Sequence, residues 1–256
     1  MKRFIVAGKS DAGTKCPENQ DACFAGTTVA SQGEVVFAIL CDGMGGMQSG
    51  EIASASIIEK YRNWFYEKCD MGESWITDIF EIHNEWEEIL EECNESIIEY
   101  GKNANIRLGS TIVMVLVTQN NVVLMNVGDS RAYFISEDVV RLSRDHSVVG
   151  KDIELGLLTE EEAKKDSRNN MLTQCVGISD EIDPFFNSFE VQNGCYVLCS
   201  DGFYNKISNN EMKNYLSGSI SDAERLSFAI DGIISADRER EEKDDISAIG
   251  IIVIDY

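Results

Sequence analysis

The sequence predicts an α+β fold in which two antiparallel sheets are covered by pairs of helices. Short apolar runs typical of strands occur early in the chain, in its middle and at its end, and amphipathic segments are grouped in pairs between them. A parallel sheet would instead alternate single strands with single helices. An Asn-Asn turn at 120–121 joins two of the central runs and is typical of antiparallel neighbours.

The first half of the chain contains the clearest predicted elements. Apolar stretches at 3–8, 22–24 and 35–40 predict strands, and the last is apolar at every position, as in a strand buried on both faces. Helices are predicted at about 51–69 and 75–100, because their apolar side chains recur at helical spacing. A region of strands follows, at 111–117, 122–127, 131–135 and 139–142.

The second half is less regular. Residues 147–190 contain a capping box at Thr159–Glu162, which predicts a short helix. This segment is open to two interpretations, a lid beside a site or an ordinary surface connection. Capping boxes at Ser208–Glu211 and Ser221–Glu224 predict two further helices before a terminal apolar strand. Because no repeat or linker interrupts the chain, we expect one domain over residues 1–256.

The composition restricts the partners. With 22 basic and 45 acidic side chains the formal charge is −23, which disfavours nucleic acid and anionic membranes and favours divalent cations or basic peptides. No apolar stretch approaches the roughly 20 residues that cross a bilayer. The 8 cysteines lack paired C-x-x-C spacing, which is typical of reduced thiols rather than of a zinc site. We therefore expect a cytoplasmic protein that binds neither nucleic acid nor membrane.

Three predicted strand ends carry aspartates. One follows the run at 35–41, one follows the run at 195–199, and a pair precedes the terminal strand; these residues are Asp42, Asp201, Asp244 and Asp245. A single Asp-Gly is typical of a turn. Its repetition, together with the glycines at 43, 45 and 46, favours one shared site over three separate turns.

The candidate ligands share one chemistry, because all of them are oxygen donors. They are Asp21, Asp42, the Gly43 carbonyl, Asp129, Asp201, Asp244 and Asp245. Such a set suits magnesium or manganese and argues against zinc or copper. Two ions bridged by one aspartate could activate a water and neutralise a phosphoryl group. The catalytic side chain therefore stays unknown, and the expected nucleophile is metal-bound water.

Other catalytic patterns do not fit. The glycines after Asp42 lack the Lys-Ser/Thr of a phosphate-binding loop, and no G-x-S-x-G motif occurs. The chain has 2 histidines. We expect His146 to tie a loop to its neighbours and His83 to pack on a helix surface, rather than to bind a metal.

The chain resembles the type-2C metal-dependent serine/threonine protein phosphatases, the PPM family, in their bacterial single-domain form. Short motifs match in family order along nearly the whole chain. They are Asn19-Gln20-Asp21, Asp42-Gly43-Met44-Gly45-Gly46 with Ser49-Gly50-Glu51, Gly109-Ser110-Thr111, Val127-Gly128-Asp129-Ser130-Arg131, Asp145-His146-Ser147, Leu172-Thr173-Gln174, Ser200-Asp201-Gly202 and Asp244-Asp245-Ile246-Ser247.

The resemblance implies a fold and a reaction. The fold is a central antiparallel β-sandwich flanked by pairs of helices, in four αββα layers, with a flap insertion at about 147–185. The reaction is hydrolysis of phosphoserine and phosphothreonine on proteins. The implied partners are phosphorylated proteins and a serine/threonine kinase that phosphorylates them, and the protein is expected to be a monomer.

The resemblance also implies two Mn²⁺ or Mg²⁺ ions and a third, weaker one. Asp42 is implied to bridge the two ions, and Gly43 to contribute its carbonyl. The remaining implied ligands are Asp201 and Asp244 at the first ion, Asp21 at the second, largely through water, and Asp129 at the third.

The sequence departs from the family pattern at several positions. Cys16 stands where many members carry an arginine that grips substrate phosphate, and Lys15 is the candidate replacement, although it lacks the bidentate fork of arginine. Met44 replaces a histidine of animal members, and Gln174 replaces a frequent arginine. Asp245 replaces a frequent asparagine, which leaves open whether Asp244 or Asp245 is the direct ligand.

Two alternatives stay open at this point. The loss of the arginine at Cys16 suggests a degenerate phosphatase fold that serves as a regulatory metal- and protein-binding module. Such a module would bind metal without turnover. A phosphatase that acts on small phosphomonoesters would keep the same chemistry, and no residue excludes it.

Overall fold

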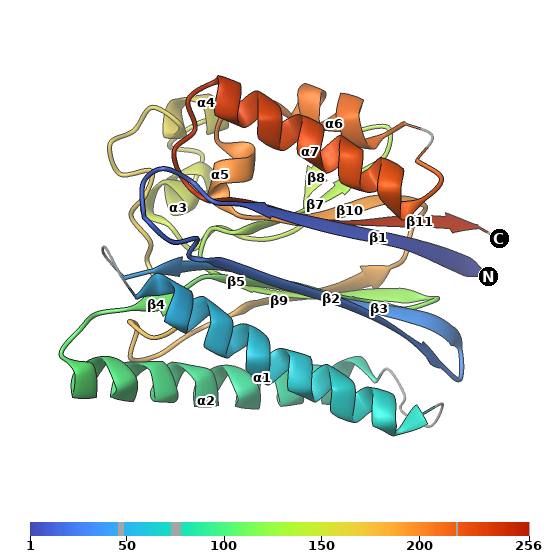
Figure 1. The fold of residues 1–256 in the computed structure, drawn as a ribbon, viewed down its shortest axis with the longest axis horizontal. Helices are drawn as coiled ribbons and strands as arrows, with labels where there is room; N and C mark the ends of the chain where they lie inside the picture. The colour runs from blue at the N-terminus through green and yellow to red at the C-terminus, as the bar shows by residue number, and fades with distance from the viewer. Residues whose placement is uncertain (46–48, 73–77, 219, 256) are drawn as a thin grey trace.

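Two antiparallel sheets stack face to face in the computed structural model, and helices cover the outer side of each (Figure 1). The structure describes residues 1–45, 49–72, 78–218 and 220–255. The predicted α+β sandwich with flanking helices is therefore confirmed.

Each sheet combines strands from distant parts of the chain. The first has the order β1-β11-β10-β7-β8, with bounds β1 Lys2–Asp11, β7 Arg131–Ile135, β8 Val139–Arg141, β10 Gly194–Cys199 and β11 Ile246–Asp255. The second has the order β2-β3-β5-β6-β9, and the two-residue β4 also pairs with β3. Its bounds are β2 Asp21–Ala30, β3 Gly33–Met44, β4 Gly109–Ser110, β5 Ile112–Val117, β6 Asn121–Val127 and β9 Phe185–Glu190.

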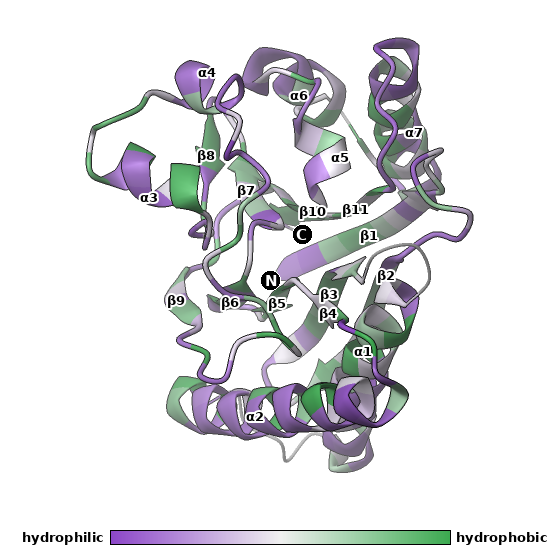
Figure 2. Cartoon of the chain, turned by 90° about the vertical axis from the view of Figure 1, so that its left-hand side faces the viewer, coloured by the Kyte–Doolittle hydropathy of each residue, from purple (hydrophilic) through white to green (hydrophobic). Residues whose placement is uncertain are grey.

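The packing of β3 explains its unbroken apolar sequence. Ala38 and Leu40 point into the core between the two sheets. Phe37 and Ile39 point the opposite way, into a second core under the helices. In Figure 2 the strands between the helix layers are largely hydrophobic, whereas hydrophilic residues dominate the outer sides of the helices. A strand buried on both faces has little freedom, so it carries Asp42 to its end in a fixed position.

Two long helices cover the second sheet. The ring of Phe37 lies 5.3 Å from that of Trp64 and 5.9 Å from that of Trp86, so one aromatic cluster joins β3 to both helices. The second helix begins at an N-cap, Asp78, whose carboxylate accepts from backbone N–H groups of the first turn. Its predicted start at 75 lies outside the described residues. The bounds of the pair are α1 Gly50–Asp70 and α2 Ile79–Ala104.

Three helices pack on the first sheet. The capping box predicted at Ser208 is confirmed, because its hydroxyl accepts from the N–H of Glu211. The box predicted at Ser221 is wrong by one residue. Asp222 is the cap, since its carboxylate accepts from the N–H of Arg225 and from the Ser221 hydroxyl. The bounds are α5 Asp201–Tyr204, α6 Asn209–Leu216 and α7 Ala223–Glu239.

The chain leaves the sandwich after β8 and returns at β9. This excursion contains two short helices, α3 Val148–Glu154 and α4 Glu160–Ala163, and the predicted capping box at Thr159 is confirmed. Ser147 pairs with Leu172, so the part of the excursion that contains both short helices begins and ends at neighbouring positions. Strand β9 was not predicted, because it is an edge strand with an exposed polar centre rather than an apolar run.

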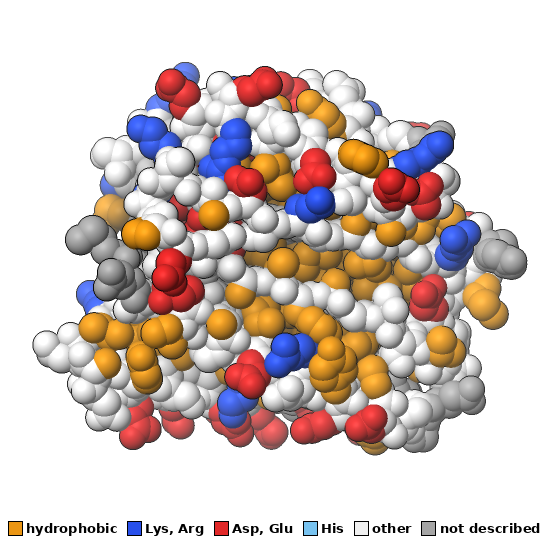
Figure 3. Space-filling view, in the orientation of Figure 1, with side chains coloured by type: hydrophobic (Ala, Val, Ile, Leu, Met, Phe, Trp, Pro, Cys, Tyr) orange, Lys and Arg blue, Asp and Glu red, His pale blue; other side chains and the backbone are white. Residues whose placement is uncertain are grey.

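The surface reflects the acidic composition. On the face shown in Figure 3, acidic side chains are scattered over both helix layers, while apolar side chains gather where the two sheets meet. No helix within the described ranges is long and apolar enough to span a bilayer.

Candidate metal centre

Asp21 and Asp42 are direct cross-strand partners at the ends of β2 and β3. Like charges placed opposite each other destabilise a sheet, because cross-strand side chains lie only about 5 Å apart. Such a pair is difficult to explain by stability. It is the first indication that the predicted shared site exists.

The backbone of Asp42 is held from both sides. Its N–H donates to the Thr111 hydroxyl at 3.0 Å, and its carbonyl accepts from the Thr111 N–H and the Ser110 hydroxyl, both at 2.9 Å. The Thr111 hydroxyl also contacts the Ser130 hydroxyl at 2.6 Å. These residues lie in matched motifs, but the sequence alone assigned them no role. They hold the peptide groups on both sides of the Asp42 carboxylate in place.

Gly43 occupies a crowded position that only glycine fits. A Cβ there would lie 2.2 Å from the carbonyl oxygen of Gly50 and 2.6 Å from that of Gln20. The start of α1 therefore packs directly against the residue that follows Asp42. Gly46, the last glycine of this motif, lies outside the described residues.

Ser200 joins the two sheets at the site. It is fully buried, its hydroxyl donates to Asp21 Oδ2 at 2.8 Å, and it accepts from the N–H of Ser247 at 3.0 Å. Asp201, the next residue, begins α5 at the end of β10. The predicted pairing of distant strand ends is thus present, with a serine as the link.

The two aspartates before β11 have different roles. Asp245 accepts from the N–H of Gly13 through Oδ1 and from the N–H of Gln20 through Oδ2, both at 2.7 Å. Both of its oxygens are therefore used to hold the 12–20 loop. Asp244 instead accepts from Lys15 Nζ at 2.7 Å and lines a cleft. The arrangement favours Asp244 over Asp245 as the ligand.

Asp129 lies in a tight turn between β6 and β7. Gly128 adopts a positive φ of 97° and donates its N–H to Nδ1 of His146, as expected for a histidine that ties a loop in place. The Tyr204 hydroxyl donates to the Asp129 carbonyl at 3.0 Å, and the Arg131 guanidinium stacks 3.8 Å above the Tyr204 ring. His83, in contrast, lies on α2 beside Glu87 and Phe186, as expected for a surface histidine.

Burial and mutual repulsion raise the pKa values of the site carboxyls. Burial raises the pKa of Asp21 to about 7, that of Asp129 to about 8 and that of Asp201 to about 6, and nearby carboxylates add to each shift. Burial also raises the pKa of Asp42 well above its usual range. The further causes there are the charges of Asp21, Asp201, Asp129 and Asp244, in that order, so four other carboxylates act on Asp42.

The donor set fits a hard divalent cation. Oδ1 of Asp21 and Oδ1 of Asp201 are buried without a hydrogen-bond partner among the described residues, although such atoms are costly to leave unpaired. As they stand, no three His, Cys, Asp or Glu side chains in the described ranges are gathered closely enough to hold an ion. A cation among these carboxylates would satisfy the free oxygens and remove the repulsion that raises the pKa values.

Glu51 is a candidate that the sequence analysis missed as a site residue. Its Oε2 is also buried without a partner in the part of the chain that the structure describes, and Glu51 follows Gly50, which packs against Gly43. The available signal was its position in a matched motif, but nothing in that motif indicated a free carboxylate oxygen.

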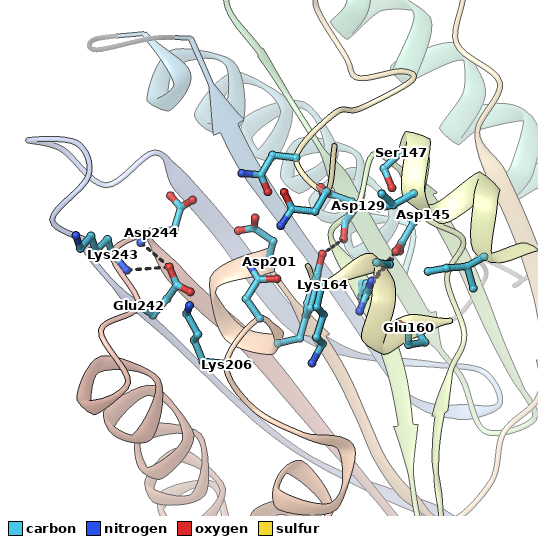
Figure 4. Close-up of a pocket in the computed structure, with 18 of the residues that line it drawn as sticks. Asp129, Asp145, Ser147, Glu160, Lys164, Asp201, Lys206, Glu242, Lys243 and Asp244 are labelled. Carbon is cyan, nitrogen blue, oxygen red and sulfur yellow. Dashed lines mark hydrogen bonds and ion pairs between the residues drawn. The ribbon is translucent and has the colours of Figure 1, made fainter. Parts of the chain in front are cut away.

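The site opens into a cleft of about 260 Å³. Figure 4 shows Asp244, Asp201 and Asp129 along it, in that order. Lys15 also lines the cleft, together with three of the predicted ligands. Asp21, Asp42 and Gly43 are not among the lining residues, although the charge of Asp42 still acts on Lys15. The far wall of the cleft is formed by residues of the excursion between β8 and β9, such as Ser147, Glu160 and Lys164.

Comparisons with known proteins agree with this geometry. A family model described as protein phosphatase 2C matches residues 8–227. Protein phosphatase PhpP of Streptococcus pneumoniae is 32% identical over 223 residues, which cover 84% of this chain and 85% of that protein. The crystal structure of serine/threonine phosphatase Stp1 from Staphylococcus aureus has a TM-score of 0.84 at 26% identity, covering 98% of this chain and 95% of that one. The catalytic domain of phosphatase PstP, solved with 2 manganese ions, has a TM-score of 0.81 at 22% identity over 100% of both chains, which shows a shared fold.

Proposed function

The chain belongs to the protein phosphatase 2C family, and we propose from this premise how its own residues hydrolyse phosphoserine and phosphothreonine on proteins. The observation that carries the proposal is the facing pair Asp21 and Asp42, with a further buried carboxylate, Asp201, beside them. The solved relative with 2 manganese ions supports divalent metal chemistry for this fold.

Two Mn²⁺ or Mg²⁺ ions are assigned to these residues. When bound, the ions supply Lewis-acid activation of water and neutralise charge on the phosphoryl group. Asp42 would hold both ions, because its carboxylate faces Asp21 across the strands and feels the charges of the other site aspartates. The remaining assignments are Asp201 and Asp244 to the first ion, the Gly43 carbonyl and Asp21 to the second, and Asp129 to a third.

Lys15 binds the substrate phosphate in place of the arginine missing at Cys16. The backbone N–H groups of Thr14 and Lys15 both donate to the Lys243 carbonyl, at 2.8 and 3.0 Å, so the loop presents Lys15 over Asp244. Partial burial alone would lower the pKa of Lys15, but its contact with Asp244 and the other site carboxylates raises it. Lys15 therefore stays charged at neutral pH and provides a point charge for phosphate.

The protein's own contribution is rigidity. Asp42 is fixed by Thr111 and Ser110, and Asp21 by Ser200, so little movement is needed when charge develops during the reaction.

The segment at 147–185 forms the flap, which borders the cleft on the side away from Asp244. We also assign to this protein a partner serine/threonine kinase, a monomeric state and a cytoplasmic location, the last supported by 8 free cysteines.

Hydrolysis of a phosphothreonine peptide with manganese, with and without chelator, tests the proposal. We expect chelator-sensitive turnover that Asp201→Asn abolishes. The matched control is Asp231→Asn, which alters only a surface ion pair with Lys9 and should retain turnover. A folded, manganese-binding protein without turnover would instead indicate the regulatory binding module, and preferential turnover of a small phosphomonoester would change the substrate class.

A further inference from the structure

The cleft beside the metal centre carries a group of lysines. Lys15, Lys164, Lys206 and Lys243 all line it. They come from four segments: the loop after β1, the end of α4, the turn after α5 and the loop before β11. With Arg131 they make five basic side chains against six carboxylates in the lining, so the cleft is much closer to charge balance than the whole chain, which has 22 basic and 45 acidic side chains.

The acidic side chains of the cleft that are not assigned to a metal ion already have partners of their own. Asp145 is paired with Arg131 at 2.6 Å and with Arg141 at 3.0 Å, and Arg141 also reaches Glu160 at 3.4 Å. Glu242 accepts from the next two backbone N–H groups, at 2.8 and 3.0 Å. None of these carboxylates therefore needs a lysine as its partner.

The lysines differ in this respect. Lys15 is paired with Asp244, but the ammonium groups of Lys164, Lys206 and Lys243 have no hydrogen-bond or ion-pair partner among the residues that the structure describes. Elsewhere on the surface some lysines, such as Lys60, form ion pairs, and others, such as Lys165, have no ion-pair partner among the described residues. Figure 4 shows Lys206 and Lys243 on the side of Asp244 and Glu242. Three lysines without a described partner thus line one cleft.

We propose that three lysines form a subsite for anionic groups that flank the phosphoresidue of the substrate, a carboxylate or a phosphate within a few residues of it. Lys206 and Lys243 lie on the Asp244 side of the cleft, and Lys164 lies on the wall across from them. This inference rests on the proposed function, because it names the substrate class of the same cleft. The remaining surface is strongly acidic and repels such a segment, so the lysines decide which phosphopeptides enter. Lysine suits this role, since its compact charge accepts either kind of anion.

Three phosphothreonine peptides test the subsite. One has alanine flanks, one has glutamate flanks, and one carries a second phosphothreonine two positions away. We expect kcat/KM for both anionic peptides to exceed that for the alanine peptide by about fivefold or more, as for one or two exposed charge pairs. The preference should shrink in 0.5 M salt, where the Debye length falls to about 4 Å. Equal gains for both peptides indicate any anion, and a gain for the third peptide alone indicates phosphate.

Neighbouring residues supply a matched pair of variants. Lys164→Gln, like Lys206→Gln and Lys243→Gln, should lower the ratio of anionic to neutral kcat/KM by about twofold to fivefold. Lys165→Gln changes the same charge one residue away, outside the cleft lining, and should keep the ratio. A ratio of one in the parent protein, or equal losses in Lys164→Gln and Lys165→Gln, would overturn the proposal.

A binding measurement separates this proposal from the assigned activity. Fluorescence anisotropy with labelled, unphosphorylated peptides compares glutamate with alanine flanks in the absence of any reaction. If no phosphopeptide is hydrolysed, the assigned function fails, whereas selective binding of the glutamate peptide that weakens in Lys206→Gln still supports the subsite. Hydrolysis without either form of selectivity leaves the function standing and rejects the subsite.

Discussion

The hydroxyl of Ser200 donates a 2.8 Å hydrogen bond to Oδ2 of Asp21, across the interface between the two sheets. One carboxylate oxygen is fixed in this way, and the other, Oδ1, is buried and has no partner within the described ranges. The orientation of a candidate metal ligand in one sheet therefore depends on a residue at the strand end of the other. The site is therefore complete only when the two sheets are stacked.

Ser200→Ala should weaken both metal binding and the fold. It removes two buried hydrogen bonds, the one donated to Asp21 and the one accepted from the Ser247 N–H, at about 1–3 kcal/mol each. Loss of a residue that orients a ligand lowers metal affinity by about 10-fold or more. Calorimetric titration with manganese and the unfolding temperature would give the two effects separately. Ser96→Ala, on the exposed face of α2, is the control, and an unchanged manganese affinity in Ser200→Ala would contradict the expectation.

Asp244→Asn and Asp245→Asn should separate ligation from loop positioning. Asp244→Asn should lower manganese affinity by at least about tenfold with little change in stability of the ion-free protein. Asp245→Asn keeps one acceptor oxygen but loses the other, so either Gly13 or Gln20 loses its partner. We expect a loss of about 1–2 kcal/mol in the free energy of unfolding and a smaller change in manganese affinity. A larger affinity loss in Asp245→Asn would reverse the assignment.

Lys15→Ala should raise KM for a phosphothreonine peptide more than it lowers kcat, because Lys15 is assigned to substrate phosphate. Manganese affinity should stay equal or improve, since the ion no longer competes with the ammonium that contacts Asp244 at 2.7 Å. Lys15→Arg should recover the KM, because guanidinium binds phosphate at least as well as ammonium. Steady-state kinetics and manganese titration on the three proteins decide this. Weaker manganese binding in Lys15→Ala would show that Lys15 supports the metal site instead.

The sequence could predict which residues meet, but not how each one is used. Asp42 and Asp201 follow apolar runs and are followed by glycine, and that local pattern was sufficient to place them in one site. The different roles of Asp244 and Asp245 depend on N–H groups more than two hundred residues away, so no local pattern contains them. Ser200 is similar, because its role exists only once the two sheets have stacked.

The errors in the predicted bounds of two elements also have physical causes. Strand β2 runs over Asp21–Ala30 rather than over its short apolar part, since an edge strand tolerates exposed threonines and small residues. The N-cap of α7 falls on Asp222 rather than on Ser221, because a carboxylate accepts more strongly than a hydroxyl that is itself donating. The edge position of β2 in the first case, and the stronger acceptor at Asp222 in the second, therefore outweighed the sequence pattern.

Asp237 predicts a pH dependence of stability that is separate from the metal centre. It is fully buried in α7, and neither carboxylate oxygen has a hydrogen-bond partner in the described part of the chain. Burial raises its pKa to about 7, against the opposing charge of Arg240. The ordinary pKa of an aspartate is about 4. Between those two values the folded protein therefore binds more protons than the unfolded chain.

It follows that Asp237 lowers the free energy of unfolding as pH rises from about 4 to about 7, and that the penalty is complete above that window. Asp237→Asn should leave stability unchanged near pH 4 and raise it by about 1–2 kcal/mol at pH 8, a figure reduced for solvent screening. Urea unfolding of both proteins at several pH values, in chelator, measures this difference. The site aspartates titrate equally in parent and variant, so they cancel from the comparison. If the difference in the free energy of unfolding between the two proteins stays constant with pH, Asp237 does not titrate in this pH range, and the expectation is wrong.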